Sequence, residues 1–261
     1  MLRDLLDSPD YSRVVAVARK PLAVSHPKLT VLIGDLASLP ALKPRLVADE
    51  IFVALGTTRK HTPDEAAYYK IDHDYPVSAA EIAKANGTRS VFLVTAVGAN
   101  ARSGAFYLRT KGEVERDILA LDFEHTHIFR PSMILGARDE DRPRERLIIA
   151  LWGVLNPLLV GPADRYRGLT GNDIAHAIAK AARHQTRRCA PIIGKRWRHC
   201  FERDAERRMG RAKRNPSRAL LRDEHDGFRK CSTHPKSCHR NSRFRTFLCD
   251  VLAWAGRPTI P

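Results

Sequence analysis

The stretch from residue 90 to residue 118 combines two hydrophobic periods that few folds accommodate in sequence. Residues 91–94 form a continuous apolar run, which is typical of a strand buried on both faces of a parallel sheet. After a loop of small residues, an apolar stripe with a helical period begins, in which successive positions are four, three and four residues apart: Tyr107, Lys111, Val114 and Ile118. A buried strand followed by a helix that packs on it predicts an α/β layered domain.

The same stripe places a tyrosine and a lysine on the face that should contact the sheet. A positive charge one helical turn away favours the ionised form of a phenol. Tyr107 could therefore exchange a proton with a carbonyl or alcohol oxygen, while Thr95, at the carboxyl end of the strand, holds that oxygen by a hydrogen bond. The alternative is a core tyrosine beside a lysine that extends its amino group to solvent. The position after a strand and a small-residue loop strengthens the catalytic interpretation without excluding the other.

The other strands of the sheet are expected at residues 13–18, 29–33, 50–55 and 126–129, which are short segments rich in apolar residues. Strands that alternate with helices imply right-handed crossovers and a parallel sheet, and such sheets bind ligands beyond the carboxyl ends of their strands. The residues that follow these runs are small, polar or basic: Arg19, Lys20, Asp35, Gly56, Thr57, Thr58, Thr95, Arg130 and Pro131. This edge of the sheet is the expected binding crevice.

Three of these positions bear on the choice of ligand. A carboxylate in this region of a dinucleotide-binding fold selects NAD, whereas the basic pair Arg19 and Lys20 would accept the 2′-phosphate of NADP. A solvated turn is the alternative for this pair. Asp35, which follows Gly34, could hydrogen-bond an adenine edge or could instead cap a turn.

The order of motifs along the chain resembles a known family. The segments VAVARK, LIGDL, VALGTTRK, KIDHDY, FLVTAVGA, FYLRTKGEVE and FRPSMILG are similar to those of the atypical short-chain dehydrogenase/reductases, which have an NAD(P)H-binding Rossmann domain. Within them the chain looks like the Tat-interacting-protein-like branch. The resemblance covers residues 2–182, and it implies a doubly wound parallel sheet.

The resemblance also implies roles for individual residues. Tyr107 would be the proton donor or acceptor, and Lys111 would be its partner and a ribose contact. The remaining cofactor contacts would be Arg19 and Lys20 on the NADP phosphate, Leu55, Gly56 and Thr57 along the cofactor, and Arg130 and Pro131 near its nicotinamide end. Thr95 stands where the family usually has serine, and it would supply the hydroxyl in that serine's place.

One expected part of this family is missing from the sequence. Its members begin with a strand and a glycine-rich turn that delivers backbone N–H groups to the pyrophosphate. None of the 15 glycines forms such a motif, and no strand pattern precedes residue 2. In the strand order 3-2-1-4-5-6 this omission predicts a gap between the strands at residues 13–18 and 50–55. We expect that the true start lies upstream; the alternative is weak cofactor binding.

Residues 183–261 differ in composition from the rest of the chain. Residues 1–182 hold 24 Lys/Arg and 22 Asp/Glu, a net charge of +2, whereas residues 183–261 hold 21 and 7, a net charge of +14, together with all five cysteines. This segment could bind nucleic acid. A zinc site at Cys231, His234, Cys238 and His239 would have poor spacing, because structural sites use two separated ligand pairs. We favour a third interpretation, in which a reading-frame shift produced an irregular, unfolded tail beyond a Rossmann domain at residues 1–182.

Other features bear on location and partners. No secretory signal is expected, because Arg3 and Asp4 interrupt the leucines of residues 1–6 and no apolar region follows them. No membrane span is expected either, because the longest apolar block, at residues 147–160, is too short and contains Asn156 and Pro157. The lack of cysteine in residues 1–182 fits a reducing compartment, so we expect a cytoplasmic protein. Residues 147–155 predict an apolar helix that covers the crevice, forms a homodimer face or belongs to the core.

Together these features predict an NADP(H)-dependent oxidoreductase that acts on a carbonyl or alcohol of an unidentified small molecule, with no bound metal. The main alternative is a non-catalytic NADPH-binding regulator. A nucleic-acid-associated protein that acts through its tail is a weaker alternative.

Overall fold

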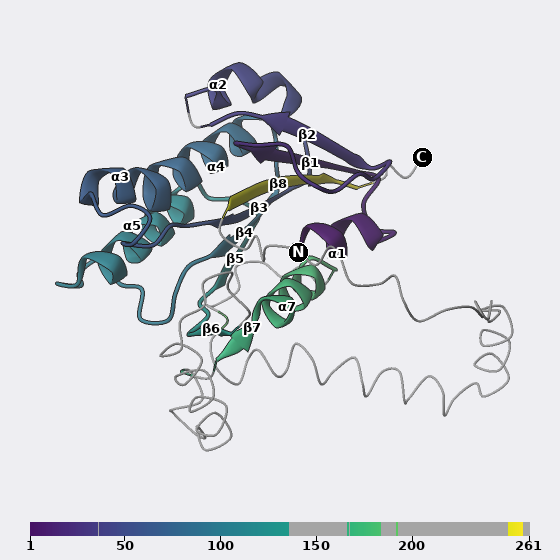
Figure 1. Cartoon of the computed structure of the whole chain (residues 1–261). Helices are drawn as coiled ribbons and strands as arrows, with labels where there is room; N and C mark the ends of the chain where they lie inside the picture. The colour runs from purple at the N-terminus through teal and green to yellow at the C-terminus, as the bar shows by residue number, and fades with distance from the viewer. Residues whose placement is uncertain (36, 136–165, 167, 184–191, 193–249, 258–261) are drawn as a thin grey trace, which may run out of the picture.

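The computed structural model describes residues 1–35, 37–135, 166, 168–183, 192 and 250–257, and these form a six-stranded sheet with helices on both faces (Figure 1). The strand order is β2 (Leu29–Ile33), β1 (Arg13–Ala18), β8 (Asp250–Gly256), β3 (Glu50–Leu55), β4 (Ser90–Val94) and β5 (His125–Phe129). A separate parallel pair is made by β6 (Ile134–Leu135) and β7 (Leu169–Thr170). The expected α/β Rossmann-like architecture is confirmed, and so are the strands expected at residues 13–18, 29–33 and 50–55.

Two hydrophobic cores, one on each face of the sheet, explain the three layers. On one face, α1 (Leu2–Asp7) and α7 (Gly171–Arg183) pack against alternate strand residues such as Phe52, Phe92 and Phe129. On the other face lie α2 (Leu39–Leu42), α3 (Glu65–Tyr69), α4 (Tyr75–Ala85) and α5 (Phe106–Ala120), as Figure 1 shows. Because successive strand residues point to opposite faces, strands that are apolar throughout can serve both cores.

The centre of the sheet differs from the sequence-based expectation of an all-parallel sheet with a gap. The strand β8 lies between β1 and β3 and runs antiparallel to both, so the sheet is mixed. Ala253 is paired with Ala16 on one side and with Phe52 on the other. Two strand edges inside a buried sheet require hydrogen-bond partners, and an apolar strand supplies them to both edges at once. The gap was therefore placed correctly, but a late segment of the chain fills it.

This segment is packed as core. Leu252, Ala253, Trp254 and Ala255 are buried, and Trp254 is among the largest fully buried side chains. Residues 250–257 consequently belong to the sheet, although the sequence analysis assigned all of residues 183–261 to an unfolded tail. The tail composition had concealed a run of small and apolar residues that suits a central strand.

An ion-pair cluster fixes the end of β8. The Arg257 guanidinium donates to Glu50 Oε1 from Nε at 2.9 Å and from a terminal nitrogen at 2.6 Å, and that nitrogen also donates to the Ala182 carbonyl oxygen at 2.6 Å. Glu50 is 1% exposed and accepts a hydrogen bond of 2.6 Å from the Tyr11 hydroxyl. A buried carboxylate needs such partners, so Arg257 connects β8 to β3 and α7.

Several earlier expectations lie outside the described residues. These are the apolar helix at residues 147–155, with its crevice-covering or homodimer role, and the zinc-ligand set at Cys231, His234, Cys238 and His239. Among the residues that the structure does describe, no helix has the length and hydropathy needed to cross a membrane, and no cluster of His, Cys, Asp or Glu has the arrangement of a metal site.

Candidate functional site

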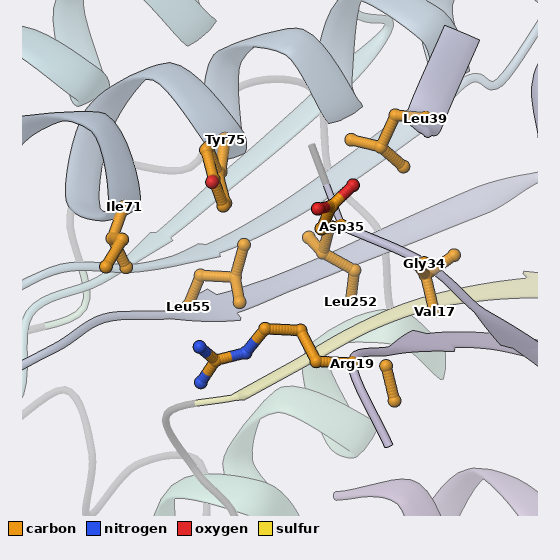
Figure 2. A pocket seen from close by; sticks show the side chains of 10 residues that line it. Val17, Arg19, Gly34, Asp35, Leu39, Leu55, Ile71, Tyr75 and Leu252 are labelled. Atoms are coloured by element: carbon orange, nitrogen blue, oxygen red, sulfur yellow. The ribbon is translucent and has the colours of Figure 1, made fainter. Parts of the chain in front are cut away.

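A cavity of about 250 Å³ lies at the carboxyl ends of β1, β2 and β3 (Figure 2). Four of the residues that line it were expected to bind a ligand or adjoin such positions: Arg19, Gly34, Asp35 and Leu55. The other lining residues are apolar or aromatic: Val17, Ala18, Leu39, Ile71, Tyr75 and Leu252. In Figure 2 the Arg19 side chain extends toward the part of the cavity formed by Leu55 and Ile71. Mostly apolar walls with a few polar groups are typical of a ligand pocket.

Asp35 forms the turn between β2 and α2. Its Oδ1 accepts the Ser38 backbone N–H at 3.0 Å, and its own N–H donates to Ser38 Oγ at 2.7 Å. Hydrogen bonding from Ser38 to the carboxyl, that of the Ser38 backbone N–H foremost, holds the pKa of the Asp35 carboxyl below its ordinary value. A side chain at Gly34 would clash with this turn, because its Cβ would lie 2.4 Å from Ser38 Oγ. The turn-capping role of Asp35 is thus observed, and its position in the cavity wall still allows contact with a ligand.

The basic pair after β1 is divided by the structure. Arg19 lines the cavity, whereas Lys20 is exposed and is not among the lining residues. An arginine fork is well suited to bind a phosphate. The residues present at this edge therefore fit the adenosine phosphate end of a dinucleotide. At the carboxyl end of β3, Leu55 is paired with Asp250, so the first residue of β8 also lies at this edge of the sheet.

A second group of residues surrounds the loop after β3. Lys111 Nζ lies 2.9 Å from Asp72 Oδ2, and both side chains are almost fully buried, at 7% and 1% exposed. The other oxygen, Asp72 Oδ1, accepts the Thr57 backbone N–H at 2.6 Å. Gly56 fits closely beside this pair, since a Cβ there would lie 3.4 Å from Lys111 Nζ. Gly56, Thr57 and Lys111 are therefore brought together, but through a carboxylate that the sequence analysis did not single out.

Tyr107 lies in the first turn of α5 and is 43% exposed. The rest of its stripe is buried as expected, with Lys111 at 6% and Val114 at 1%. The expectation that Tyr107 itself faces the sheet is wrong, because the helix begins beyond the carboxyl edge and its first turn opens to solvent. An exposed phenol at this edge is accessible to a substrate, whereas the charge of Lys111 is balanced by Asp72.

Tyr68 on α3 is a second phenol near this loop. Its hydroxyl donates to the Thr57 carbonyl oxygen at 3.2 Å, and its ring is buried. Burial is the main cause that raises the Tyr68 pKa, and the charges of Asp72 and Tyr107 add to it. Tyr68 therefore stays protonated, and its hydroxyl holds the backbone at Thr57 in place through this hydrogen bond.

Thr95 is bonded to a buried carboxylate. Its hydroxyl donates to Glu115 Oε1 at 2.5 Å, and Glu115 is 4% exposed. Arg130 binds the same carboxylate through Nε at 2.9 Å and through a terminal nitrogen. Thr95 has one proton and donates it to Glu115, so here the hydroxyl does not point that proton at a substrate oxygen. The Arg130 side chain likewise joins β5 to α5, and Pro131 is buried beside it, its carbonyl accepting from Val97 N–H at 2.9 Å.

Three residues of the motif KGEVE have a structural reason. Lys111 and Glu115 reach the two buried ion pairs, and Gly112 allows α5 to approach the loop after β4. A Cβ on Gly112 would lie 2.1 Å from the Ala101 nitrogen, so this position has no room for a side chain. Asp72 and Glu115 lie in segments that the sequence analysis quoted, so the motif signal was present, but their partners were not predicted. Leu252, which also lines the cavity, had no sequence feature that marked it as a site residue.

Comparisons with known proteins place this fold in a family. No protein-family model matches the chain. Over 192 residues it is 37% identical to the mitochondrial protein fmp52 of Aspergillus clavatus. This match covers 70% of this chain and 79% of the Aspergillus clavatus protein. The chain belongs to the FMP52 family. It is also 37% identical over 138 residues to FMP52 of Candida glabrata and 35% identical over 146 residues to FMP52 of Saccharomyces cerevisiae. These matches cover 53% and 54% of this chain, and they span 59% and 62% of the two FMP52 proteins.

The names of these FMP52 relatives correct one expectation. Homologues over most of the chain are named mitochondrial proteins, so the prediction of a cytoplasmic location is wrong. That prediction depended on the lack of cysteine in residues 1–182, which indicates a reducing compartment but does not say which one.

Solved structures confirm the fold. MoeE5 in complex with UDP-glucose and NAD has a TM-score of 0.50 with 22% identity, and the match covers 69% of this chain and 67% of MoeE5. The dTDP-glucose 4,6-dehydratase DesIV from Streptomyces venezuelae, with NAD and DAU bound, has the same TM-score and coverage with 18% identity. At these identities the likeness concerns the Rossmann-like fold alone.

Proposed function

We propose that this FMP52-family chain is an NADP(H)-binding oxidoreductase of the atypical short-chain dehydrogenase type, in its Tat-interacting-protein-like branch. The observation that carries the proposal is the cavity at the carboxyl ends of β1, β2 and β3, with Arg19 and Asp35 as its polar groups. Arg19 binds the 2′-phosphate, and Leu55 and Tyr75 line the space for the adenosine. MoeE5 and DesIV, which share this fold, were both solved with NAD bound, and this supports the cofactor class.

The reaction proposed for this site is reduction of a carbonyl or its reverse. The bound nicotinamide would supply a hydride to the carbonyl carbon, giving an alcohol and NADP⁺. Tyr107 donates its hydroxyl proton to the carbonyl oxygen, which its exposed position at the start of α5 permits. Asp72 holds Lys111 and the Thr57 N–H in place, so the ion pair orients the loop along which the cofactor lies. Glu115 holds Thr95 and Arg130 and so fixes α5 against the sheet.

A second candidate, a non-catalytic NADPH-binding regulator, is favoured by one observation. Lys111 is paired with Asp72, and Thr95 donates to Glu115, so two of the three residues expected to be catalytic have structural partners. In this case the cavity binds the cofactor and Tyr107 has no chemical role.

Turnover by the full chain separates the two candidates. Purified protein is titrated with NADPH and then assayed with NADPH against a panel of aldehydes and ketones. Tyr107→Phe should lower turnover by about 10² to 10⁴ while NADPH affinity changes little, because positioned proton transfer contributes to that extent. Tyr69→Phe is the matched control, because the Tyr69 ring stacks on His73 at 4.5 Å, away from the cavity wall. NADPH binding without any turnover in the wild type would establish the regulator instead.

The mitochondrial names of the relatives support a mitochondrial location for this chain as well. Fractionation of cells that express the full protein at its native level tests this. Recovery with the mitochondrial fraction is expected, and recovery in the cytosol alone would refute it.

A further inference from the structure

Beside Tyr107, two arginines lie close to one aromatic ring. The Arg59 guanidinium carbon is 5.4 Å from the Phe106 ring centroid, and that of Arg109 is 5.7 Å from it. Arg59 comes from the loop after β3 and Arg109 from the first turns of α5, so two separate elements contribute the charges. The Tyr68 ring packs against Phe106 edge-on at 5.6 Å, which fixes the orientation of the Phe106 ring.

This cluster adjoins the proposed reaction site. Phe106 immediately precedes Tyr107, and Tyr68 connects the cluster to the Thr57 backbone through its hydroxyl. The first turn of α5 contains no acidic residue. The cluster and Tyr107 therefore lie at the same end of α5, and the Tyr68 ring, which packs on Phe106, also has Tyr107 as an electrostatic neighbour.

The partners of the two arginines are weak ones. Arg59 is paired with Glu65, but the two side chains are 60% and 56% exposed, and exposed pairs contribute only about 0 to 1 kcal/mol. Arg109 donates to the Ser103 carbonyl oxygen at the long distance of 3.4 Å. Each guanidinium has five N–H groups, and these contacts use one of them in each residue. Two like charges beside the same ring also repel each other, and a bound anion would relieve that repulsion.

We propose that Arg59, Phe106 and Arg109 bind the anionic end of the substrate, a carboxylate or phosphate attached to a flat apolar body that stacks on Phe106. Bidentate hydrogen bonds from arginine are suited to both anions, and the ring supplies the apolar contact. The inference rests on the proposed function, because it assigns the substrate class of the same site. It predicts that the natural substrate is an anionic carbonyl compound or the corresponding alcohol.

The test compares matched probes on the full chain saturated with NADP⁺, which carries no hydride and cannot reduce them. The probes are para-formylbenzoate, its uncharged methyl ester and para-formylphenyl phosphate, and their binding is measured by calorimetry; their reduction is measured separately with NADPH. The double variant Arg59→Gln/Arg109→Gln removes both charges. The double variant Arg89→Gln/Arg116→Gln is the control, because it removes two exposed charges that are paired with Glu124 and Asp117.

The wild type should bind an anionic probe at least about tenfold more tightly than the ester, a difference of about 1.4 kcal/mol. Arg59→Gln/Arg109→Gln should abolish this preference and leave ester binding within about twofold, whereas the control should keep it. Tighter binding of the phosphate probe than of the benzoate assigns a phosphate to the substrate, and the reverse order assigns a carboxylate.

Failure of this inference can be distinguished from failure of the proposed function. If the anionic probes bind no better than the ester, or if their advantage survives Arg59→Gln/Arg109→Gln, the anion site is refuted even when the ester is reduced by NADPH. If the arginine-dependent preference is present but neither the probes nor any member of the aldehyde and ketone panel is reduced by NADPH, the anion site stands and the oxidoreductase is refuted.

Discussion

The replacement Trp254→Ala tests whether β8 is part of the sheet. Trp254 is fully buried and is paired with Val15 on β1 and with Ile51 on β3. Large aromatic side chains in cores cost about 3 to 5 kcal/mol when truncated to alanine, because apolar contacts are lost and a cavity remains. We therefore expect the free energy of unfolding to fall by about that amount, which is a large share of the total of about 5 to 15 kcal/mol for a typical domain.

Urea unfolding followed by far-ultraviolet circular dichroism measures this loss. Trp254→Phe should cost less than Trp254→Ala, since a ring remains in the core and, among the residues that are described, the indole N–H has no hydrogen-bond partner to lose. Leu119→Ala is the control, because Leu119 is apolar but 42% exposed, and it should change stability by less than about 0.5 kcal/mol. A loss below about 1 kcal/mol for Trp254→Ala would show that the tail does not supply the central strand.

Two further predictions concern buried charges. Burial lowers the pKa of His127 from 6.5 to about 4, so the folded state favours the neutral ring. The resulting contribution to the free energy of unfolding is complete above about pH 6.5 and is lost as the pH falls toward 4, by an amount on the order of 3 kcal/mol. His127→Phe should remove this part of the pH dependence when urea unfolding is measured at several pH values. If the free energy of unfolding varies with pH in the same way in the variant and the wild type, the prediction is contradicted. Asp72→Asn should cost about 3 to 5 kcal/mol, because Lys111 is left buried without a counter-charge. Adding Lys111→Met should recover part of this loss, and strict additivity in the double-mutant cycle would refute the coupling.

The sequence predicts most of the sheet because parallel strands carry a strong local signal. Runs such as residues 14–18 and 51–55 are apolar throughout, and the residues that follow them are an arginine and a glycine. The strand β8 was missed for a different reason. Its apolar run is short and follows a long basic segment, and only the two open edges of β1 and β3, which are a tertiary feature, give it a place.

The candidate site was predictable in part for the same physical reason. The carboxyl ends of parallel strands meet at one edge, so Arg19, Asp35 and Leu55 could be expected to converge, and they line one cavity. The partners of the buried side chains were not predictable. Asp72 lies in a π-helical turn at Lys70–Asp74 and pairs with Lys111, and Glu115 on α5 binds Thr95. Both pairs therefore depend on how separate elements pack and not on spacing in the sequence.

The most direct test of the account is the relative affinity of the full chain for NADPH and NADH, measured by fluorescence titration in the wild type and in Arg19→Glu. Because Arg19 lines the cavity, the wild type should prefer NADPH, and Arg19→Glu should shift the ratio of affinities toward NADH by at least about tenfold, or about 1.4 kcal/mol. Lys20→Glu, at an exposed position outside the cavity wall, should shift it less. If neither nucleotide binds, or if the ratio of affinities is unchanged in Arg19→Glu, an NADP(H) site at this edge of the sheet is contradicted.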